Sequence, residues 1–233
     1  MLEICRAGTW PVIELYVDDS VTEQEKESIE TMLGHDTPVH RESSDRIVEL
    51  CHSKAHQGYL AKMAEYPYKD LREVIGNAHA GTGRTWIILD RVQDPYNTGA
   101  IIRSAEVLGI QGIIIPRTGQ CGVNSMTART SAGAVNRIPI ARVDDLARSV
   151  AFMKEKGIRI AGADAGEGVP VYEYNFMSPA AVILGNEAQG IRPEIRSLCD
   201  TFIHIPRKGA IDSLNVAQAA AVICYEILRQ HQA

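Results

Sequence analysis

Residues 201–223 read Thr-Phe-Ile-His-Ile-Pro-Arg-Lys-Gly-Ala-Ile-Asp-Ser-Leu-Asn-Val-Ala-Gln-Ala-Ala-Ala-Val-Ile. The apolar start predicts a strand that stops at Pro206, and the small residues at the end predict a helix. Ser213 and Asn215 stand on the first turn of that helix, where backbone N–H groups are unpaired and such side chains are favoured. The stretch is therefore either an ordinary capped helix or a ligand site that presents a hydroxyl, a carboxamide and free amides together.

The same strand–loop–helix unit recurs from residue 85 onward. The predicted strands cover residues 86–90, 112–115, 137–140, 159–163, 180–184 and 202–205. The predicted helices cover residues 98–108, 124–132, 143–156 and 214–230. Apolar strands that alternate with helices predict an α/β domain built on a mostly parallel, buried sheet.

The N-terminal part carries a shorter pattern of the order β-α-β-α-β, which predicts a small α/β module over residues 1–66. A predicted helix over residues 69–78 and a glycine-containing stretch over 79–84 follow. We therefore expect three parts, with the small module over 1–66, a linker and helix over 67–84, and the larger domain over 85–233.

The bulk composition favours a globular protein of the cytoplasm. Hydrophobic residues make up 45% of the 233 residues and charged residues 23%. The chain has no apolar run of about 18 residues that could span a bilayer, and its start does not resemble a signal peptide. The net charge of −5 argues against a general nucleic-acid coat but leaves room for a local basic patch.

Several common chemistries lack their sequence signatures. The five cysteines are odd in number and scattered, so we expect neither a disulfide framework nor a zinc site. Gly185 and Gly190 are five residues apart, but the Lys-Ser/Thr of a phosphate-binding loop does not follow them. Gly-x-Gly-x-x-Gly after a strand, Gly-x-Ser-x-Gly and His-Glu-x-x-His are also missing, which disfavours dinucleotide, hydrolase and metalloprotease roles.

Three motifs stand at the ends of predicted strands. They are Val92-x-Asp94-Pro95-x-Asn97-x-Gly99-x-x-x-Arg103-Ser104-Ala105, Leu184-Gly185-Asn186-Glu187-x-x-Gly190 and Ile205-Pro206-x-x-Gly209-x-x-x-Ser213-Leu214-Asn215-Val216. In this order they resemble the signatures of the SpoU/TrmH RNA 2′-O-ribose methyltransferases of the SPOUT superfamily. The resemblance spans residues 85–230, and three motifs in order are far more specific than any one of them.

The resemblance implies a SPOUT α/β-knot fold with a C-terminal trefoil knot. It implies S-adenosylmethionine as cofactor, no metal, and a homodimer whose active site is shared across the interface. The implied catalytic residues are Arg103, Asn97, Glu187, Ser213 and Asn215. The implied cofactor-binding residues are Leu184, Gly185, Asn186, Gly190, Ile205, Pro206 and Leu214.

The implied reaction transfers a methyl group from a sulfonium to a ribose 2′-hydroxyl, which needs the three reacting atoms aligned. Arg103 stands at the position of the residue that is the proposed general base in the family. A guanidinium has a pKa above about 12, so we expect Arg103 to hold a phosphate and polarise the hydroxyl instead.

The first module resembles the substrate-binding domain of RlmB-type enzymes, which act on large-subunit rRNA, through His56-Gln57-Gly58 before a strand. These three residues are also suited to turn the chain into that strand. Only residues 2–7 of the family's first strand–helix element are expected here, so the start looks shortened. We expect an rRNA substrate, with tRNA as the alternative. A non-catalytic RNA-binding or ribosome assembly factor with the same fold is the rival from another class.

Overall fold

The computed structural model describes residues 9–33, 36–54, 56–76 and 84–232. The chain divides into two compact units, residues 1–67 and 68–233, and each is described here by itself. The expected remnant over residues 2–7 and most of the glycine-containing stretch over 79–84 lie outside the described residues.

The first unit is a three-stranded sheet with two helices. Its strands are β1 (Val12–Asp18), β2 (Val39–Glu42) and β3 (Tyr59–Met63), and its helices are α2 (Glu23–Leu33) and α3 (Ser44–Cys51). The strand order is β2-β1-β3, with β2 parallel and β3 antiparallel to β1. Leu15, Val17 and Ile29 bury a small core between the sheet and α2.

The turn into β3 is made by the residues that the sequence singles out there. Gly58 N–H donates to Nδ1 of His56 over 3.1 Å, and Nε2 of His56 lies 3.3 Å from Oγ of Ser44. Gln57 and Gly58 both have positive φ angles, of 52° and 81°, which glycine adopts without strain. The His56 ring therefore braces this turn.

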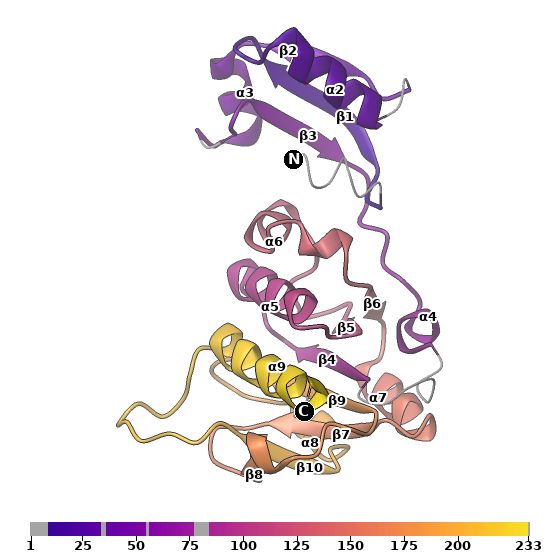
Figure 1. Cartoon of the computed structure of the whole chain (residues 1–233), viewed down its shortest axis with the longest axis vertical. Helices are drawn as coiled ribbons and strands as arrows, with labels where there is room; N and C mark the ends of the chain where they lie inside the picture. Colours follow the sequence, from indigo (N-terminus) through magenta and orange to yellow (C-terminus); the bar gives the residue numbers. More distant parts are fainter. Residues whose placement is uncertain (1–8, 34–35, 55, 77–83, 233) are drawn as a thin grey trace. The chain divides into compact units, whose positions relative to one another are not determined.

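The second unit is built on a parallel sheet (Figure 1). Its strands are β4 (Thr85–Asp90), β5 (Gly112–Pro116), β6 (Ile140–Val143), β7 (Arg159–Ala163), β8 (Val169–Pro170), β9 (Ala180–Gly185) and β10 (Thr201–His204). Its helices are α4 (Leu71–Ile75), α5 (Pro95–Val107), α6 (Ser125–Thr130), α7 (Leu146–Glu155), α8 (Pro193–Arg196) and α9 (Val216–Gln232). The order of the strands is β6-β5-β4-β9-β7-β10-β8, and each neighbouring pair is parallel.

Helices cover both faces of this sheet, as the apolar strand runs predict. Trp86 and Ile88 of β4 share one core with Val150 and Met153 of α7 and with residues of α4 and α8. The other face carries α5 and α9, and α6 packs against α5 (Figure 1). The expected α/β class with a mostly parallel sheet is thus confirmed.

One predicted strand is displaced. The strand expected over residues 137–140 begins at Ile140, and the residues before it form a short 3₁₀ turn, η1 (Ala134–Asn136). Pro139 has no N–H to donate, although its carbonyl accepts from Ile113 N–H. The following helix starts at Leu146 and not at residue 143, because the Asp145 carboxylate caps it by accepting from Arg148 N–H.

Two further findings complete the fold. The predictions missed β8, α8 and a second 3₁₀ turn, η2 (Val171–Glu173), all of which are too short to show a period in sequence. No helix in the described ranges is both long enough and apolar enough to cross a membrane.

Candidate active site

The first two motifs directly follow two neighbouring strands of the sheet. Strands β4 and β9 pair in register through their last residues, with Leu89 opposite Leu184 and Asp90 opposite Gly185. Because the strands are parallel, the segments that follow them emerge at the same edge of the sheet. This carboxyl edge is where open α/β sheets bind ligands.

The helix that carries the first motif begins with a strong cap. The Asp94 carboxylate accepts from the N–H groups of Tyr96 and Asn97, and Pro95 occupies the first turn, where its missing N–H costs nothing. Inside α5, Gly99 allows close packing, since a Cβ there would lie 2.7 Å from Cβ of Thr130. Local chemistry thus places Asn97 at the entrance of α5, facing the end of β9.

A chain of hydrogen bonds joins the three motifs. Nδ2 of Asn97 donates to Oε1 of Glu187 over 2.7 Å, and Nδ2 of Asn215 donates to Oδ1 of Asn97 over 3.1 Å. Oδ1 of Asn215 in turn accepts from Ala217 N–H at the start of α9 over 2.9 Å. Three residues predicted from separate motifs therefore form one polar cluster at the carboxyl edge of the sheet.

The second motif folds into a tight turn. The side-chain oxygen of Asn186 accepts from the N–H groups of Ala188 and Gln189, while its Nδ2 donates to the Arg91 carbonyl over 3.0 Å. The backbone approach inside the turn requires a glycine, since a Cβ on Gly185 would lie 2.3 Å from the carbonyl carbon of Gly190. Asn186 thus shapes the turn that presents Glu187.

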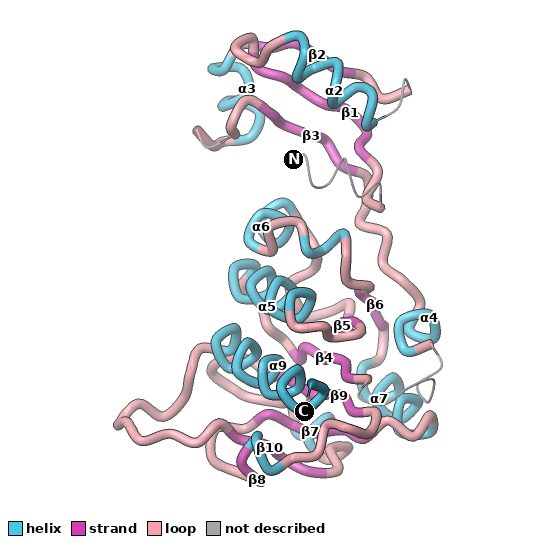
Figure 2. Tube along the Cα trace, viewed as in Figure 1, coloured by secondary structure: helices cyan, strands magenta, loops and turns pink. Residues whose placement is uncertain are grey.

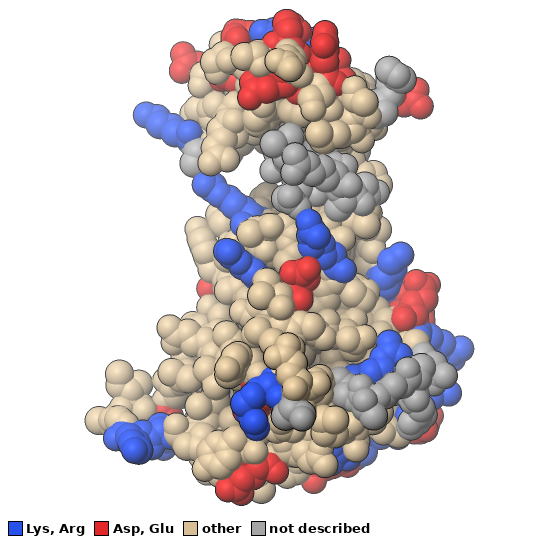
Figure 3. Space-filling model, in the orientation of Figure 1, with Lys and Arg blue, Asp and Glu red and all other residues tan. Residues whose placement is uncertain are grey.

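The third motif is an extended loop between β10 and α9, which Figure 2 shows as a long segment without helix or strand. Among the described residues, the N–H groups of residues 207–214 find no acceptor in the chain. Leu214 is 48% exposed and Ile211 is 81% exposed, so this loop presents apolar surface to its surroundings. Lys208 and Arg207 add positive charge to this loop, and Figure 3 shows blue atoms at its protruding end.

These features fit the cofactor that the resemblance implies. Free backbone amides can bind the polar edge of a nucleoside, and exposed apolar side chains can cover its ring. The glycines of the turn after β9 let its backbone approach a ligand closely. Leu184 is buried beneath this region and Ile205 is half-buried at the end of β10, so both lie where backbone atoms could hold a cofactor.

Two predicted catalytic residues do not join the polar cluster. Arg103 lies on the exposed side of α5 and, within the described residues, makes no hydrogen bond or ion pair. Ser213 lies exposed in the loop, and its hydroxyl likewise has no partner there. Both side chains are free to meet groups from outside this chain.

Sequence reasoning missed a buried ion pair beneath the turn. Asp90, at the end of β4, is fully buried, and its carboxylate accepts from Nε and N–H of Arg192 over 2.7 and 2.8 Å. This pair ties the end of the turn after β9 to β4. The signal in the sequence that could have indicated this pair is Asp90 itself, a charged residue directly after the apolar residues of β4.

The sequence analysis also did not identify Arg91 as a residue that shapes the site. Its φ of 66° is uncommon for a residue other than glycine, and its Nη1 donates to Oε1 of Gln189 over 2.9 Å. Its aliphatic stem lies near Gly119. Arg91 thus bridges the loop after β5 and the turn after β9.

Comparison with known proteins places these features in a family. The sequence profile described as the SpoU rRNA Methylase family matches residues 84–225. A crystal structure of the SpoU methyltransferase AviRb of Streptomyces viridochromogenes, in complex with AdoMet, superposes with a TM-score of 0.83 at 27% identity, over 99% of this chain and 87% of that one. An AdoMet-bound rRNA methyltransferase of Sinorhizobium meliloti superposes with a TM-score of 0.85 at 25% identity, over 98% of this chain and 85% of that one.

Curated sequences give the same result. An uncharacterized tRNA/rRNA methyltransferase of Synechocystis is 36% identical over 203 residues, which are 87% of this chain and 53% of that protein. An uncharacterized tRNA/rRNA methyltransferase of Mycobacterium ulcerans is 31% identical over 234 residues, which are 100% of this chain and 75% of that protein. The chain thus spans about half the length of the Synechocystis relative.

The fold is that of the SpoU methyltransferases of known structure, which confirms the expected SPOUT fold. The expectation that the cofactor is S-adenosylmethionine is confirmed by the two similar structures solved with it. The chain belongs to the SpoU rRNA Methylase family.

Proposed function

We propose that this protein transfers the methyl group of S-adenosylmethionine to a ribose 2′-hydroxyl in structured RNA. The observation that carries the proposal is the hydrogen-bonded chain from Asn215 through Asn97 to Glu187. It joins all three motifs at one point, beside a loop whose backbone N–H groups are free.

In this proposal backbone atoms hold the cofactor between two loops. Leu184, Gly185, Asn186 and Gly190 belong to the turn after β9, and Ile205, Pro206 and Leu214 belong to the loop after β10. The bound cofactor supplies an electrophilic methyl group on a sulfonium sulfur. The narrow Gly185–Gly190 turn and the apolar Leu214 would orient the cofactor and exclude water from it.

The polar side chains act on the RNA. Asn97, Glu187 and Asn215 hold one another in place and thereby fix the position of the ribose. Arg103 would bind a phosphate next to that ribose and polarise the 2′-hydroxyl, which would lose its proton to solvent as its oxygen bonds to the methyl carbon and the carbon–sulfur bond breaks. The Ser213 hydroxyl contributes a further hydrogen bond at the entrance of the site.

We further propose that the enzyme is a homodimer in which the Arg103 side chain of each subunit contributes to the active site of its partner. Exposed apolar residues line the outer sides of α5 and α9, which pack against each other. On α5, Tyr96 is 57% exposed and Val107 is 68% exposed, and Arg103 lies on the same helical stripe. On α9, Val222 and Tyr225 continue the apolar surface. Such a surface on neighbouring helices is suited to bury itself against a second copy.

The substrate proposed is rRNA, and the proposed location is the cytoplasm. The choice of rRNA is supported by the small α/β unit that precedes the catalytic unit, because this unit resembles the substrate-binding domain of enzymes that act on large-subunit rRNA. The relatives are named for both tRNA and rRNA, so tRNA is the alternative outcome of the test.

The test is methyl transfer from radiolabelled S-adenosylmethionine to total RNA, followed by nuclease digestion and mass spectrometry of the nucleosides. We expect a 2′-O-methylated nucleoside that maps to rRNA. Label in a methylated base would contradict the ribose assignment. Cofactor binding without any transfer would favour the non-catalytic RNA-binding factor.

A further inference from the structure

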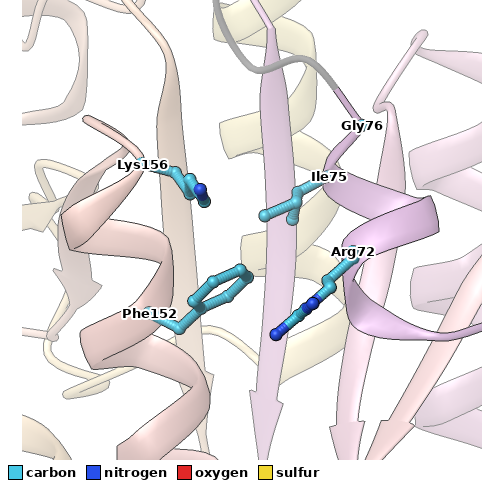
Figure 4. A pocket seen from close by; sticks show the side chains of 5 residues that line it. All are labelled: Arg72, Ile75, Gly76, Phe152 and Lys156. Atoms are coloured by element: carbon cyan, nitrogen blue, oxygen red, sulfur yellow. The ribbon is translucent and has the colours of Figure 1, made fainter.

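A hollow of about 310 Å³ lies on the second unit, far from the polar cluster. It is lined by Arg72, Ile75, Gly76, Phe152 and Lys156. Figure 4 shows the side chains of α4 and of the end of α7 facing one another across it. Its volume lies at the lower end of the range of small-molecule sites, about 300–1,000 Å³.

The hollow lies at the edge of the sheet where strands begin. Lys156 follows α7 and leads into β7, while Trp86 at the start of β4 donates its indole N–H to the Val74 carbonyl of α4 over 3.0 Å. The polar cluster with Asn97 lies at the opposite edge. Six residues of β4 separate the two edges, roughly 20 Å for an extended strand.

The charges around the hollow are unbalanced. The protein has a net charge of −5, yet none of the described residues that line the hollow carries a carboxylate. Arg72 and Lys156 are exposed and, in the described part of the chain, neither forms an ion pair. Such a concentration of positive charge favours an anionic ligand.

The remaining walls are flat and apolar. The Arg72 guanidinium carbon lies 5.5 Å and the Lys156 Nζ lies 5.4 Å from the centroid of the Phe152 ring. Ile75 also lines the hollow but is only 2% exposed, so the partly buried Phe152 ring supplies the accessible apolar surface. An aromatic ring beside two flexible cations is the arrangement that proteins use to stack a nucleobase and bind its phosphate.

We infer that this hollow binds one unstacked nucleotide of single-stranded RNA. The base would stack on the Phe152 ring, and Arg72 and Lys156 would share its phosphate. This inference rests on the proposed function, because a flanking nucleotide held at the far edge of the sheet would add affinity for an RNA whose ribose reacts at the other edge.

The test measures binding of a fluorescent twelve-nucleotide oligouridine to the full chain at several salt concentrations. We expect Arg72→Gln/Lys156→Gln to raise Kd about tenfold and to lower the salt slope by about 0.7, the value for one phosphate on a single strand. We expect Phe152→Leu to raise Kd about tenfold without changing the salt slope, because it removes stacking and no charge. Arg148→Gln, which removes an exposed cation from the same helix outside the lining, is the matched control and should change Kd less than twofold.

Three results would overturn the inference. One is a double variant that binds like Arg148→Gln, and another is a Phe152→Leu variant that binds like the wild type. The third is a Kd for uridine monophosphate equal to that for the oligonucleotide, which would make the hollow a site for free nucleotides. Oligouridine binding that depends on the hollow in a protein that methylates no RNA would instead contradict the proposed function and leave this inference standing.

Discussion

At the residue scale, the decisive contrast is between side chains with partners and those without. Hydrogen bonds join the side chains of Asn97, Glu187 and Asn215. By contrast, no side-chain hydrogen bond or ion pair within the described residues involves Arg103 or Ser213. A residue that is free and exposed contributes little to stability, so a defect caused by its removal must come from lost contacts with substrate.

Arg103→Ala should therefore lower the methyl transfer rate at least about 100-fold, because it removes charge stabilisation at the reacting hydroxyl. The Kd for S-adenosylmethionine, measured by calorimetry, should change less than twofold. Arg129→Ala, an exposed arginine on the neighbouring α6, is the matched control and should retain most activity. An equal loss of cofactor affinity in Arg103→Ala would contradict the assignment.

Asp90→Ala should destabilise the second unit by about 2–3 kcal/mol, because it leaves the donors of Arg192 without their acceptor. Urea denaturation measures this change. Asp144→Ala breaks the ion pair with Arg117, in which the aspartate side chain is 80% exposed, and should cost less than about 1 kcal/mol. Equal effects for the two variants would show that burial of Asp90 does not matter.

At the element scale, the apolar strands were predictable and the short elements were not. Strands β4 and β9 are buried along almost their whole length, so their composition alone marks them. By contrast, β8 has two residues and α8 has four, and such segments are held by tertiary contacts and not by any period of their own. The misplaced strand over residues 137–140 shows that a proline moves an element boundary even within an apolar run.

The turn after β9 gives a prediction at this scale. Gly185→Ala places a Cβ 2.3 Å from the Gly190 carbonyl carbon and should destabilise the protein by about 1–3 kcal/mol, with weaker cofactor binding. Gly166→Ala, outside the proposed cofactor loops, is the control, since a Cβ there would meet no heavy atom within 4 Å. Thermal melts with and without S-adenosylmethionine measure both effects. A Gly185→Ala protein with the melting temperature and cofactor affinity of Gly166→Ala would exclude a tight turn after β9.

At the scale of the whole molecule, carboxylates with depressed pKa values should set the response to acid. Hydrogen bonds from Arg229 hold the pKa of Glu226 below its usual value. Burial would raise the pKa of Asp164, but the N–H of Gly166 and the guanidinium of Arg196 together lower it.

A carboxylate whose pKa is lower in the folded state stabilises the fold above its unfolded pKa. That contribution is lost as the pH falls through the folded pKa. The free energy of unfolding should therefore decrease as the pH falls below about 4.5, the ordinary value for a glutamate. Glu226→Gln should flatten this dependence in urea titrations at several pH values. An unchanged pH profile would mean that the Arg229 pair does not persist in solution.

The proposed dimer also belongs to this scale. Val222→Glu places a charge on the outer side of α9 and should convert the dimer to a monomer, as measured by light scattering after gel filtration. Leu50→Glu in the first unit is the matched control, because both residues are 40% exposed. We expect the monomeric variant to lose methyl transfer while keeping its fold by circular dichroism. A wild-type protein that is monomeric at all concentrations would refute the shared site.

The sequence by itself determined the class of fold, the three motifs and their attachment to the ends of strands, because buried strands and helix caps leave local signals in composition and spacing. Only the tertiary structure decided which of those residues meet. Asn97 and Asn215 are 118 residues apart, and their contact depends on β9 lying beside β4 and on the loop after β10 returning to the same edge. The buried Asp90–Arg192 pair spans 102 residues in the same way. Such long-range pairs have no period in sequence, since they arise from the packing of whole elements and not from the preferences of single residues.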